Sequence, residues 1–266
     1  MRFLANAIRV AGNPSMLVRY CEWMASRQPA IAVEGQLFSG FATFSDYWSF
    51  YKDRPTAGEI ALIRRELSGG GVAIDVGANI GLYAFLMARA SSAVEVHAFE
   101  PVGRTFGLLR RNLRQIPNVR CHRLAVSDYV GTAHMTCFEA GFTMNRITEP
   151  DSCNKVEVVV IITIENFCQN NNIDAIQLIK IDVEGKEPEV LHGLGTLRPS
   201  TIIIEICPSN LERSGSSIID LYECIDSLGY KVYDLSDDGF PHDELSLKDL
   251  AAIKLANVVL KPAQTV

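Results

Sequence analysis

From Thr56 onward, short apolar segments alternate with segments of helical pattern, and this alternation restricts the fold more than any other feature of the sequence. Strands that alternate with helices are typical of a parallel sheet with helices on both faces. A continuous apolar run such as Val72–Val76 also suits a strand that is buried on both sides. We therefore predict an α/β domain with a mostly parallel sheet. Its strands are expected at Val72–Val76, Ala93–Phe99, Val119–Val126, Ile176–Asp182, Thr201–Ile206, Tyr230–Leu235 and Ile253–Leu260.

The segments between these strands carry their own signals. Thr56 and Glu59 have the spacing of a capping box, in which each side chain satisfies a free amide at the start of a helix. Pro101–Ile116 combines an apolar stripe with arginines off that stripe, so we expect an amphipathic helix. Residues 130–162 have a strand-type pattern on both sides of a connection that contains Gly and Asn, which predicts a β insertion.

We divide the chain at about residue 54, because the regular pattern begins just after it. Residues 1–54 are rich in aromatic side chains and hold both tryptophans, Trp23 and Trp48. We expect a helix and a short strand pair near Ile31–Phe44 that together cover the substrate side of a domain formed by residues 55–266. Contact with a second copy of the chain is the other role expected of this segment.

Composition argues against several classes of protein. The 266 residues are 48% hydrophobic and 21% charged, which is typical of a globular chain, and no apolar run approaches the roughly 18 residues of a membrane helix. Asp and Glu total 31 against 25 Lys and Arg, which disfavours a nucleic-acid partner because such partners need a basic surface. The seven cysteines have no CxxC or zinc-like spacing, so we expect reduced thiols and a cytoplasmic protein.

The sharpest local motif is Asp75-Val76-Gly77-Ala78-Asn79-Ile80-Gly81, where a predicted strand gives way to a helix. Glycines there let the backbone approach a ligand beyond the carboxyl ends of the strands. The GxGxxG spacing of a dinucleotide site is absent. An acid at the strand end suits the ammonium group of S-adenosylmethionine (SAM) better than a pyrophosphate, so SAM is the expected cofactor. A glycine turn without a ligand is the structural alternative.

Glu100 follows the next predicted strand, about 20 residues beyond the glycine loop, where nucleoside-binding folds place an acid on the ribose hydroxyls. Pro101 then suits the first turn of a helix. The alternative for Glu100 is an acid that only complements the helix dipole.

Two acids in Lys180-Ile181-Asp182-Val183-Glu184-Gly185 end a strand on the same edge as Asp75. Charged residues rarely end a buried strand unless they are paired or functional. Asp182 is the first candidate for a general base and Glu184 the second, and the two alternate faces if the backbone is still extended there. A salt bridge from Asp182 to Lys180 or Lys186 is the structural alternative.

Metal and histidine chemistry have weaker signals. His192 follows a helix start and is a further candidate base, although a lone His on a helix is more often structural. The sequence has no HxH or HExxH spacing, so a His-built metal site is not expected. A Mg²⁺ site formed by Asp182 and Glu205 is conceivable, because Mg²⁺ prefers carboxylate oxygens.

Together these motifs resemble the FkbM family of SAM-dependent methyltransferases, over about residues 50–262. The resemblance implies a Rossmann-like class I methyltransferase fold, with a seven-stranded, mostly parallel sheet whose last strand, Ile253–Leu260, is antiparallel. Thr163-Ile164-Glu165 departs from the Leu-Asp that is usual in the family. The motifs that carry the resemblance are Asp75–Gly81, Phe99-Glu100-Pro101, Ala125-Val126-Ser127-Asp128, and above all Lys180–Gly185 with Glu187, Val190, Leu191 and Gly193.

The resemblance also implies site residues and a reaction. The expected reaction is methylation of a hydroxyl on a sugar, glycan or polyketide-type natural product, with Asp182, Glu184 or His192 acting on the hydroxyl. A NAD-dependent oxidoreductase and a non-catalytic SAM-binding module stay open as alternatives. The residues expected to hold SAM are Asp75, Gly77, Ala78, Asn79 and Gly81 at its methionine end, Glu100 and Pro101 at the ribose, and Ser127 and Asp128 near the adenine.

Overall fold

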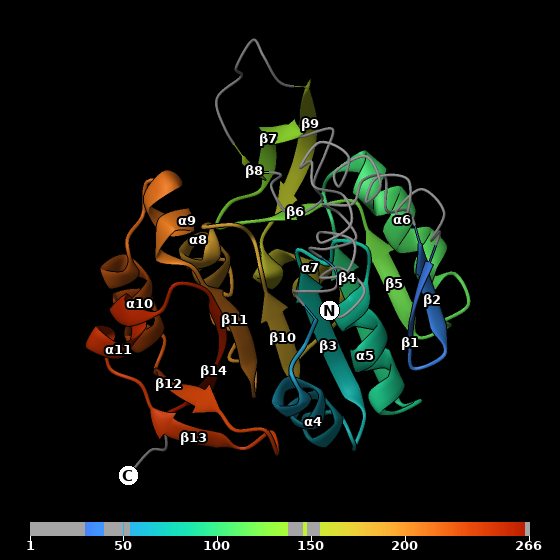
Figure 1. Cartoon of the computed structure of the whole chain (residues 1–266). Coiled ribbons are helices and arrows are strands. Elements are labelled where there is room, and N and C mark those ends of the chain that lie inside the picture. The colour runs from blue at the N-terminus through green and yellow to red at the C-terminus, as the bar shows by residue number, and fades with distance from the viewer. Residues whose placement is uncertain (1–29, 40–49, 51–53, 138–145, 148–154, 264–266) are drawn as a thin grey trace, which may run out of the picture.

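The computed structural model describes residues 30–39, 50, 54–137, 146–147 and 155–263. Its largest sheet has eight strands, in the order β13-β12-β14-β11-β10-β3-β4-β5 (Figure 1). The five strands from β11 to β5 are parallel, whereas β14 is antiparallel to both of its neighbours, β11 and β12. The strands are β3 (Gly71–Val76), β4 (Val94–Phe99), β5 (Val119–His122), β10 (Leu178–Ile181), β11 (Ile202–Ile206), β12 (Tyr230–Leu235), β13 (Pro241–Glu244) and β14 (Ala256–Pro262).

This topology confirms the mostly parallel α/β fold with an antiparallel last strand. The sheet differs from the seven strands that were expected, because Pro241–Glu244 pairs with the end of β12 as an additional hairpin strand. Gly239, with φ of +85°, forms the turn of this hairpin, and such a φ strongly favours glycine. The segment Pro241-His242-Asp243-Glu244 lacks the apolar alternation from which a strand is predicted.

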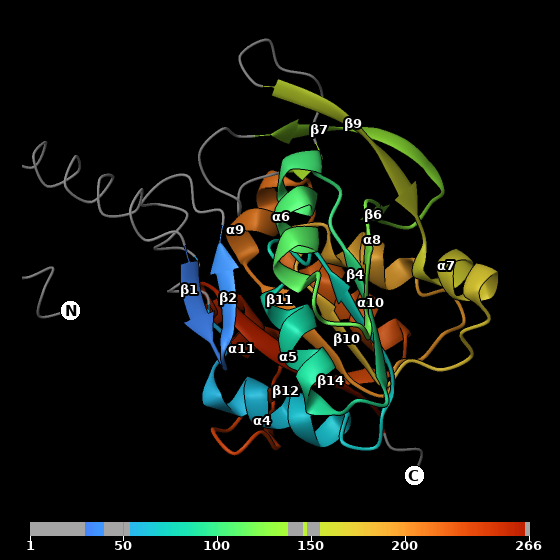
Figure 2. The ribbon, with the colours of Figure 1, turned by 90° about the vertical axis from the view of Figure 1, so that its right-hand side faces the viewer.

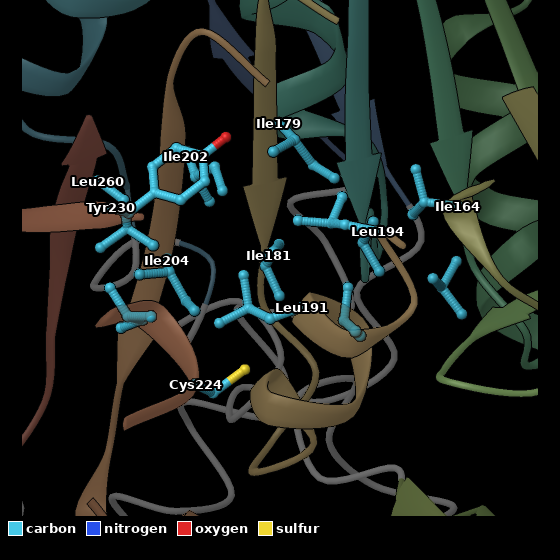
Figure 3. Packing of buried hydrophobic residues seen from close by; sticks show 14 of the residues in the cluster. Ile164, Ile179, Ile181, Leu191, Leu194, Ile202, Ile204, Cys224, Tyr230 and Leu260 are labelled. Carbon is cyan, nitrogen blue, oxygen red and sulfur yellow. The ribbon is translucent and has the colours of Figure 1, made fainter. Parts of the chain in front are cut away.

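Helices cover both faces of the sheet (Figures 1 and 2). One face packs against α4 (Ala57–Glu66), α5 (Leu82–Ala90) and α6 (Gly103–Leu113). The other face packs against α7 (Ile164–Asn171), α8 (Glu187–His192), α9 (Pro208–Arg213), α10 (Ile218–Ser227) and α11 (Leu247–Ala252). Figure 3 shows the apolar core of this second face, where strand residues Ile179, Ile181, Ile202 and Ile204 form one cluster with Leu191 of α8 and Cys224 of α10.

The capping box at the start of α4 is confirmed. The amide of Glu59 donates to Thr56 Oγ1 over 3.2 Å, and the amide of Thr56 donates to Glu59 Oε2 over 2.7 Å. Within the described part of the chain, no helix is long and apolar enough to cross a membrane.

A second, four-stranded sheet contains β6 (Ala125–Val126), β9 (Lys155–Ile162), β7 (Gly131–Cys137) and β8 (Arg146–Ile147). The single strand expected at Val119–Val126 is therefore wrong: its first half is β5 of the main sheet, and its second half is β6. The chain changes sheets at Arg123, whose guanidinium pairs with Glu157 of β9. Beyond it, Ala125 packs with Met135, Val159 and Ile161 in a separate small core.

The expected N-terminal strand pair is present as β1 (Ala30–Val33) and β2 (Gln36–Ser39), which form an antiparallel hairpin beside α5 and α6 (Figure 2). Phe38 is fully buried, and its ring lies 5.5 Å from that of Phe50 and 5.6 Å from that of Phe85 in α5. Phe38 therefore seals the core rather than covering a substrate. Trp23 and Trp48 lie outside the described residues.

Candidate active site

The carboxyl ends of β3 and β10 lie side by side. Lys180 is the register partner of Asp75, and the amide of Asp182 donates to the carbonyl oxygen of Val76 over 3.0 Å. On the other side of β3, the amides of Gly77 and Ala78 donate to the carbonyl oxygen of Phe99, over 3.1 and 2.9 Å. The expected adjacency of the strands that end near Asp75 and Asp182 is confirmed.

The glycine loop is shaped by close packing. Gly77 has φ of +80°, and a Cβ atom there would overlap the carbonyl oxygen of Asp182. Gly81, the N-cap of α5, has φ of +101°, and a Cβ atom there would lie 2.7 Å from Leu113 of α6. Both positions favour glycine because of the backbone geometry and the neighbouring atoms. The fold alone therefore explains why glycine is found at both positions. Evidence for a bound ligand has to come from the polar groups around them.

Asn79 and Glu100 are the polar residues that indicate a ligand site. Asn79 has φ of +51°, and its buried Oδ1 has no hydrogen-bond partner among the described residues. Unsatisfied buried polar atoms are rare, so each calls for an explanation such as a ligand or water. Glu100 is 7% exposed and its Oε1 accepts from the amide of Val102 over 2.9 Å. Burial raises the pKa of Glu100 to about 8, against the opposing effect of the amides of Val102 and Asn79.

This donor set fits the ribose of SAM. A carboxyl with a pKa near 8 is mostly protonated at neutral pH, so it can donate one hydrogen bond and accept others. A ribose diol offers the complementary groups, and the orphaned Asn79 Oδ1 adds a further acceptor on the neighbouring glycine loop. The assignment of Pro101 to the cofactor site stays a prediction; it directly follows Glu100 and precedes α6.

Asp75 has a role that the sequence did not reveal. Its side chain is 2% exposed, and Oδ2 accepts from the amide of Ala84 in the first turn of α5 over 2.9 Å. Burial raises the pKa of Asp75 to about 7, although the nearby Lys180 ammonium and the Ala84 amide oppose this effect. Asp75 therefore ties the end of β3 to the start of the helix that follows the loop. Its contact with the methionine end of SAM stays a prediction.

Ser127 and Asp128 follow β6, so they lie at the end of the second sheet rather than of the main one. The Ser127 amide donates to the carbonyl oxygen of Ile162 over 3.1 Å, and its hydroxyl donates to Asp128 Oδ1 over 3.2 Å. Ser127 is buried and Asp128 is exposed. Their placement near an adenine stays a prediction.

Lys180 pairs with Asp182, as the structural alternative required. The Lys180 side chain is 1% exposed, and Nζ lies 3.2 Å from Asp182 Oδ2 and 5.2 Å from the centre of the Tyr83 ring. Burial acts to lower the pKa of Lys180, but the carboxylates of Asp182 and Glu205 outweigh it and the pKa is raised, so the group stays an ammonium. The Asp182 side chain is 32% exposed and still reaches solvent. Lys186 pairs instead with Glu189.

Glu184 lies on a turn rather than on extended backbone, so the condition under which it would alternate faces with Asp182 is not met. Glu184 and Gly185 have φ of +57° and +102°. The amides of Val183 and Gly185 donate to Glu187 Oε1 over 3.2 and 3.1 Å, which fixes this turn. Burial, with the nearby carboxylates of Asp182 and Glu187, raises the pKa of Glu184 to about 8.

A polar network beside Lys180 was not predicted from the sequence. The Tyr83 hydroxyl donates to Glu59 Oε1 over 2.6 Å, and Asn257 Nδ2 donates to the same oxygen over 2.7 Å. Asn257 is also the register partner of Glu205, whose pKa is raised to about 9 by burial and by Asp182. Only the capping spacing of Glu59 was visible in the sequence, because the other members come from distant segments.

His192 and a metal site are the remaining candidates. His192 is exposed in the last turn of α8, and we find no hydrogen bond from its ring to the candidate acids in the described part of the chain. Among the described residues, no group of three or more His, Cys, Asp or Glu side chains is arranged to hold a metal ion. The Mg²⁺ site considered for Asp182 and Glu205 would use only two of these side chains, so it stays a prediction.

The fold and the edge described here define the class. A parallel sheet with an antiparallel strand inserted between β11 and β12, and with a glycine loop and an acid after neighbouring strands, is a class I methyltransferase fold. The family model of the methyltransferase FkbM domain matches residues 75–232, which is more than half of the chain. The chain belongs to this family.

The curated relatives include two methyltransferases with named substrates. The 31-O-demethyl-FK506 methyltransferase FkbM of Streptomyces tacrolimicus is 31% identical over 160 residues, which cover 48% of this chain and 61% of that protein. The hexuronic acid methyltransferase AglP of Haloferax volcanii is 28% identical over 200 residues, which cover 71% and 81%. The chain spans about three fifths of the length of the first relatives that it matches.

Solved structures resemble the chain more remotely. The fibrillarin pre-rRNA processing protein of Methanococcus jannaschii is 12% identical with a TM-score of 0.45, over 89% of this chain and 83% of that one. A likeness of this degree carries no argument about substrate or activity.

Proposed function

We propose that this protein transfers the methyl group of SAM to a hydroxyl oxygen of a sugar, glycan or polyketide-type natural product. The proposal rests on one observation. The glycine loop lies next to the strand end that carries the buried Glu100, and Asn79 Oδ1 of this loop has no hydrogen-bond partner among the described residues. Membership of the FkbM methyltransferase family supports it. The names of two relatives, a demethyl-FK506 and a hexuronic acid methyltransferase, support an oxygenated natural product or sugar as the acceptor.

The residues that would hold the cofactor come from two neighbouring strand ends. Glu100 would bind the ribose hydroxyls, and Gly77, Ala78, Asn79 and Gly81 would present backbone to the methionine end. When bound, SAM supplies an electrophilic methyl group. The protein's own task is to hold the acceptor oxygen in line with that group and to exclude water, since positioning supplies much of the rate of such a displacement.

Asp182 is the residue that we propose for the acceptor hydroxyl. Its carboxylate lies next to the end of β3, reaches solvent, and is held by the buried Lys180 ammonium at 3.2 Å. A hydroxyl is a weak nucleophile, and a base within reach of its proton contributes about 10²–10⁴-fold. Glu184 is the second choice, because its raised pKa keeps it largely protonated at neutral pH.

Two experiments test this function. Native mass spectrometry of the protein with SAM, S-adenosylhomocysteine and NAD should show binding of the first two and none of NAD. Radiolabelled SAM with a panel of hydroxylated glycans and polyketides should then label an acceptor. Binding of NAD alone would favour the oxidoreductase, and SAM binding without transfer to any oxygen nucleophile would favour a non-catalytic module.

A further inference from the structure

Three chain segments meet at the side chain of Asn112 in α6. Asn112 is 3% exposed, and its Nδ2 donates to the carbonyl oxygen of Ile80 in the glycine loop over 3.0 Å. Its Oδ1 accepts from the amide of Ser39 at the end of β2 over 3.1 Å. Its backbone carbonyl oxygen accepts from Gln36 Nε2 over 2.6 Å. One buried side chain therefore joins the loop to the N-terminal hairpin.

The orientation of this amide is determined by its partners. The Ile80 carbonyl can only accept and the Ser39 amide can only donate, so Nδ2 must face the loop and Oδ1 the hairpin. A flipped amide would lose both bonds and place like groups against each other. Each end of the side chain thus depends on the position of a different segment.

The bond to Ile80 acts at a sensitive point of the loop. Ile80 precedes Gly81, the left-handed N-cap of α5, and Gly81 packs against Leu109 and Leu113 of α6. The hairpin also packs against α5, because the buried Phe38 ring lies against that of Phe85. The hairpin therefore contacts both helices that flank the loop, and Asn112 connects it to the loop backbone.

We propose that Asn112 is a positioning residue for the methyl-donor loop, and that through it the docking of the β1–β2 hairpin sets the affinity for SAM. This inference rests on the proposed function, since it takes the loop to be the SAM site. It assigns to part of the N-terminal segment a role on the cofactor side of the protein, in addition to the covering of the acceptor that the sequence suggested.

Calorimetric titration with S-adenosylhomocysteine tests the inference. Asn112→Ala should weaken binding by about fivefold to tenfold, the scale of the buried hydrogen bonds that it removes. Asn118→Ala is the matched control. Asn118 Nδ2 donates to the carbonyl oxygen of Ala88, near the C-terminal end of α5, over 3.1 Å and to that of Val94, at the start of β4, over 2.9 Å. Asn118→Ala should lower the melting temperature as Asn112→Ala does, but its affinity for S-adenosylhomocysteine should stay within about twofold of that of the wild type.

Hydrogen exchange supplies a second readout. In the wild type, S-adenosylhomocysteine should slow exchange of the Ser39 amide, and Asn112→Ala should abolish this effect. If Asn112→Ala does not fold, Gln36→Ala decides, because it removes only the bond from the hairpin to the Asn112 carbonyl; it should weaken binding at least twofold. Equal affinity of the Asn112 or Gln36 variant and the Asn118 variant would overturn the inference. Failure of the wild type itself to bind would instead overturn the proposed function.

Discussion

Buried carboxyls dominate the candidate site at the scale of single residues. Asp75 and Glu100 are both almost fully buried, and burial raises their pKa values to about 7 and about 8. A carboxyl whose pKa is higher in the folded than in the unfolded protein stabilises the fold at low pH. That contribution is lost as the pH rises through the folded value. The site is therefore arranged at a cost in stability at neutral and alkaline pH.

Glu100→Gln should reveal that cost. The substitution keeps the shape but cannot ionise, so the variant should gain melting temperature relative to the wild type as the pH rises from about 4.5 to about 8. Thermal unfolding of both proteins at intervals across this range measures the difference. A difference that does not change with pH would show that Glu100 titrates normally in the folded protein.

Asp182→Asn tests the proposed base. With an identified acceptor, kcat should fall by at least about 10²-fold while SAM affinity is nearly unchanged. The pair with Lys180 offers a structural role as the competing explanation. In that case the melting temperature falls and the folded fraction keeps its kcat, which would move the search for a base to Glu184, His192 and Glu205.

At the scale of elements, the glycine loop depends on how closely two strand ends pass each other. Gly77→Ala would place a Cβ against the Asp182 carbonyl in a left-handed conformation, so it should destabilise the protein strongly and reduce SAM binding. Gly107→Ala is a matched control in α6, where an added Cβ has no neighbour within 4 Å. It should stabilise the fold by about 0.5–1 kcal/mol, because alanine is the better helix former. Urea unfolding of both variants checks that the free energy of unfolding falls for Gly77→Ala and rises for Gly107→Ala.

Some features of these elements could be predicted from the sequence and others could not. The placement of Asp75, Glu100 and Asp182 at one edge of the sheet could be predicted from local motifs, because the carboxyl ends of parallel strands meet there. The division of Val119–Val126 between two sheets was missed, because an apolar run does not say which partner strand it joins. Contacts such as Asn112 to Ile80 and Tyr83 to Glu59 join segments that are distant in the sequence, so no local sequence pattern predicts them.

At the scale of the whole molecule, two histidines make the sheet sensitive to acid. His97 and His122 lie on neighbouring strands with ring nitrogens 3.1 Å apart. Burial lowers the pKa of both, that of His122 to about 4. The unfolded chain takes up these protons near pH 6.5 and the folded one only at lower pH, near pH 4 for His122, so stability falls as the pH drops below about 6.5.

His122→Phe should remove part of that sensitivity. Phenylalanine keeps a ring beside Phe99 and Phe167, whose centres lie 4.8 and 4.9 Å from that of His122. The melting temperature of the variant should rise relative to that of the wild type as the pH falls from 7 to 4.5. The buried carboxyls change stability in the opposite direction, but they do so in both proteins, so the difference between the two melting temperatures is free of their effect. A constant difference would mean that His122 is not protonated preferentially in the unfolded state.

The central claim is that the edge formed by β3, β4 and β10 binds SAM, with Glu100 on the ribose. The most direct measurement is calorimetric titration of S-adenosylhomocysteine into the wild type and into Glu100→Ala, at a pH where circular dichroism shows both to be folded. The account predicts binding to the wild type and a loss of about 1–3 kcal/mol in the variant, the scale of removing one partner of a buried hydrogen bond. Equal affinity of the two folded proteins would contradict it.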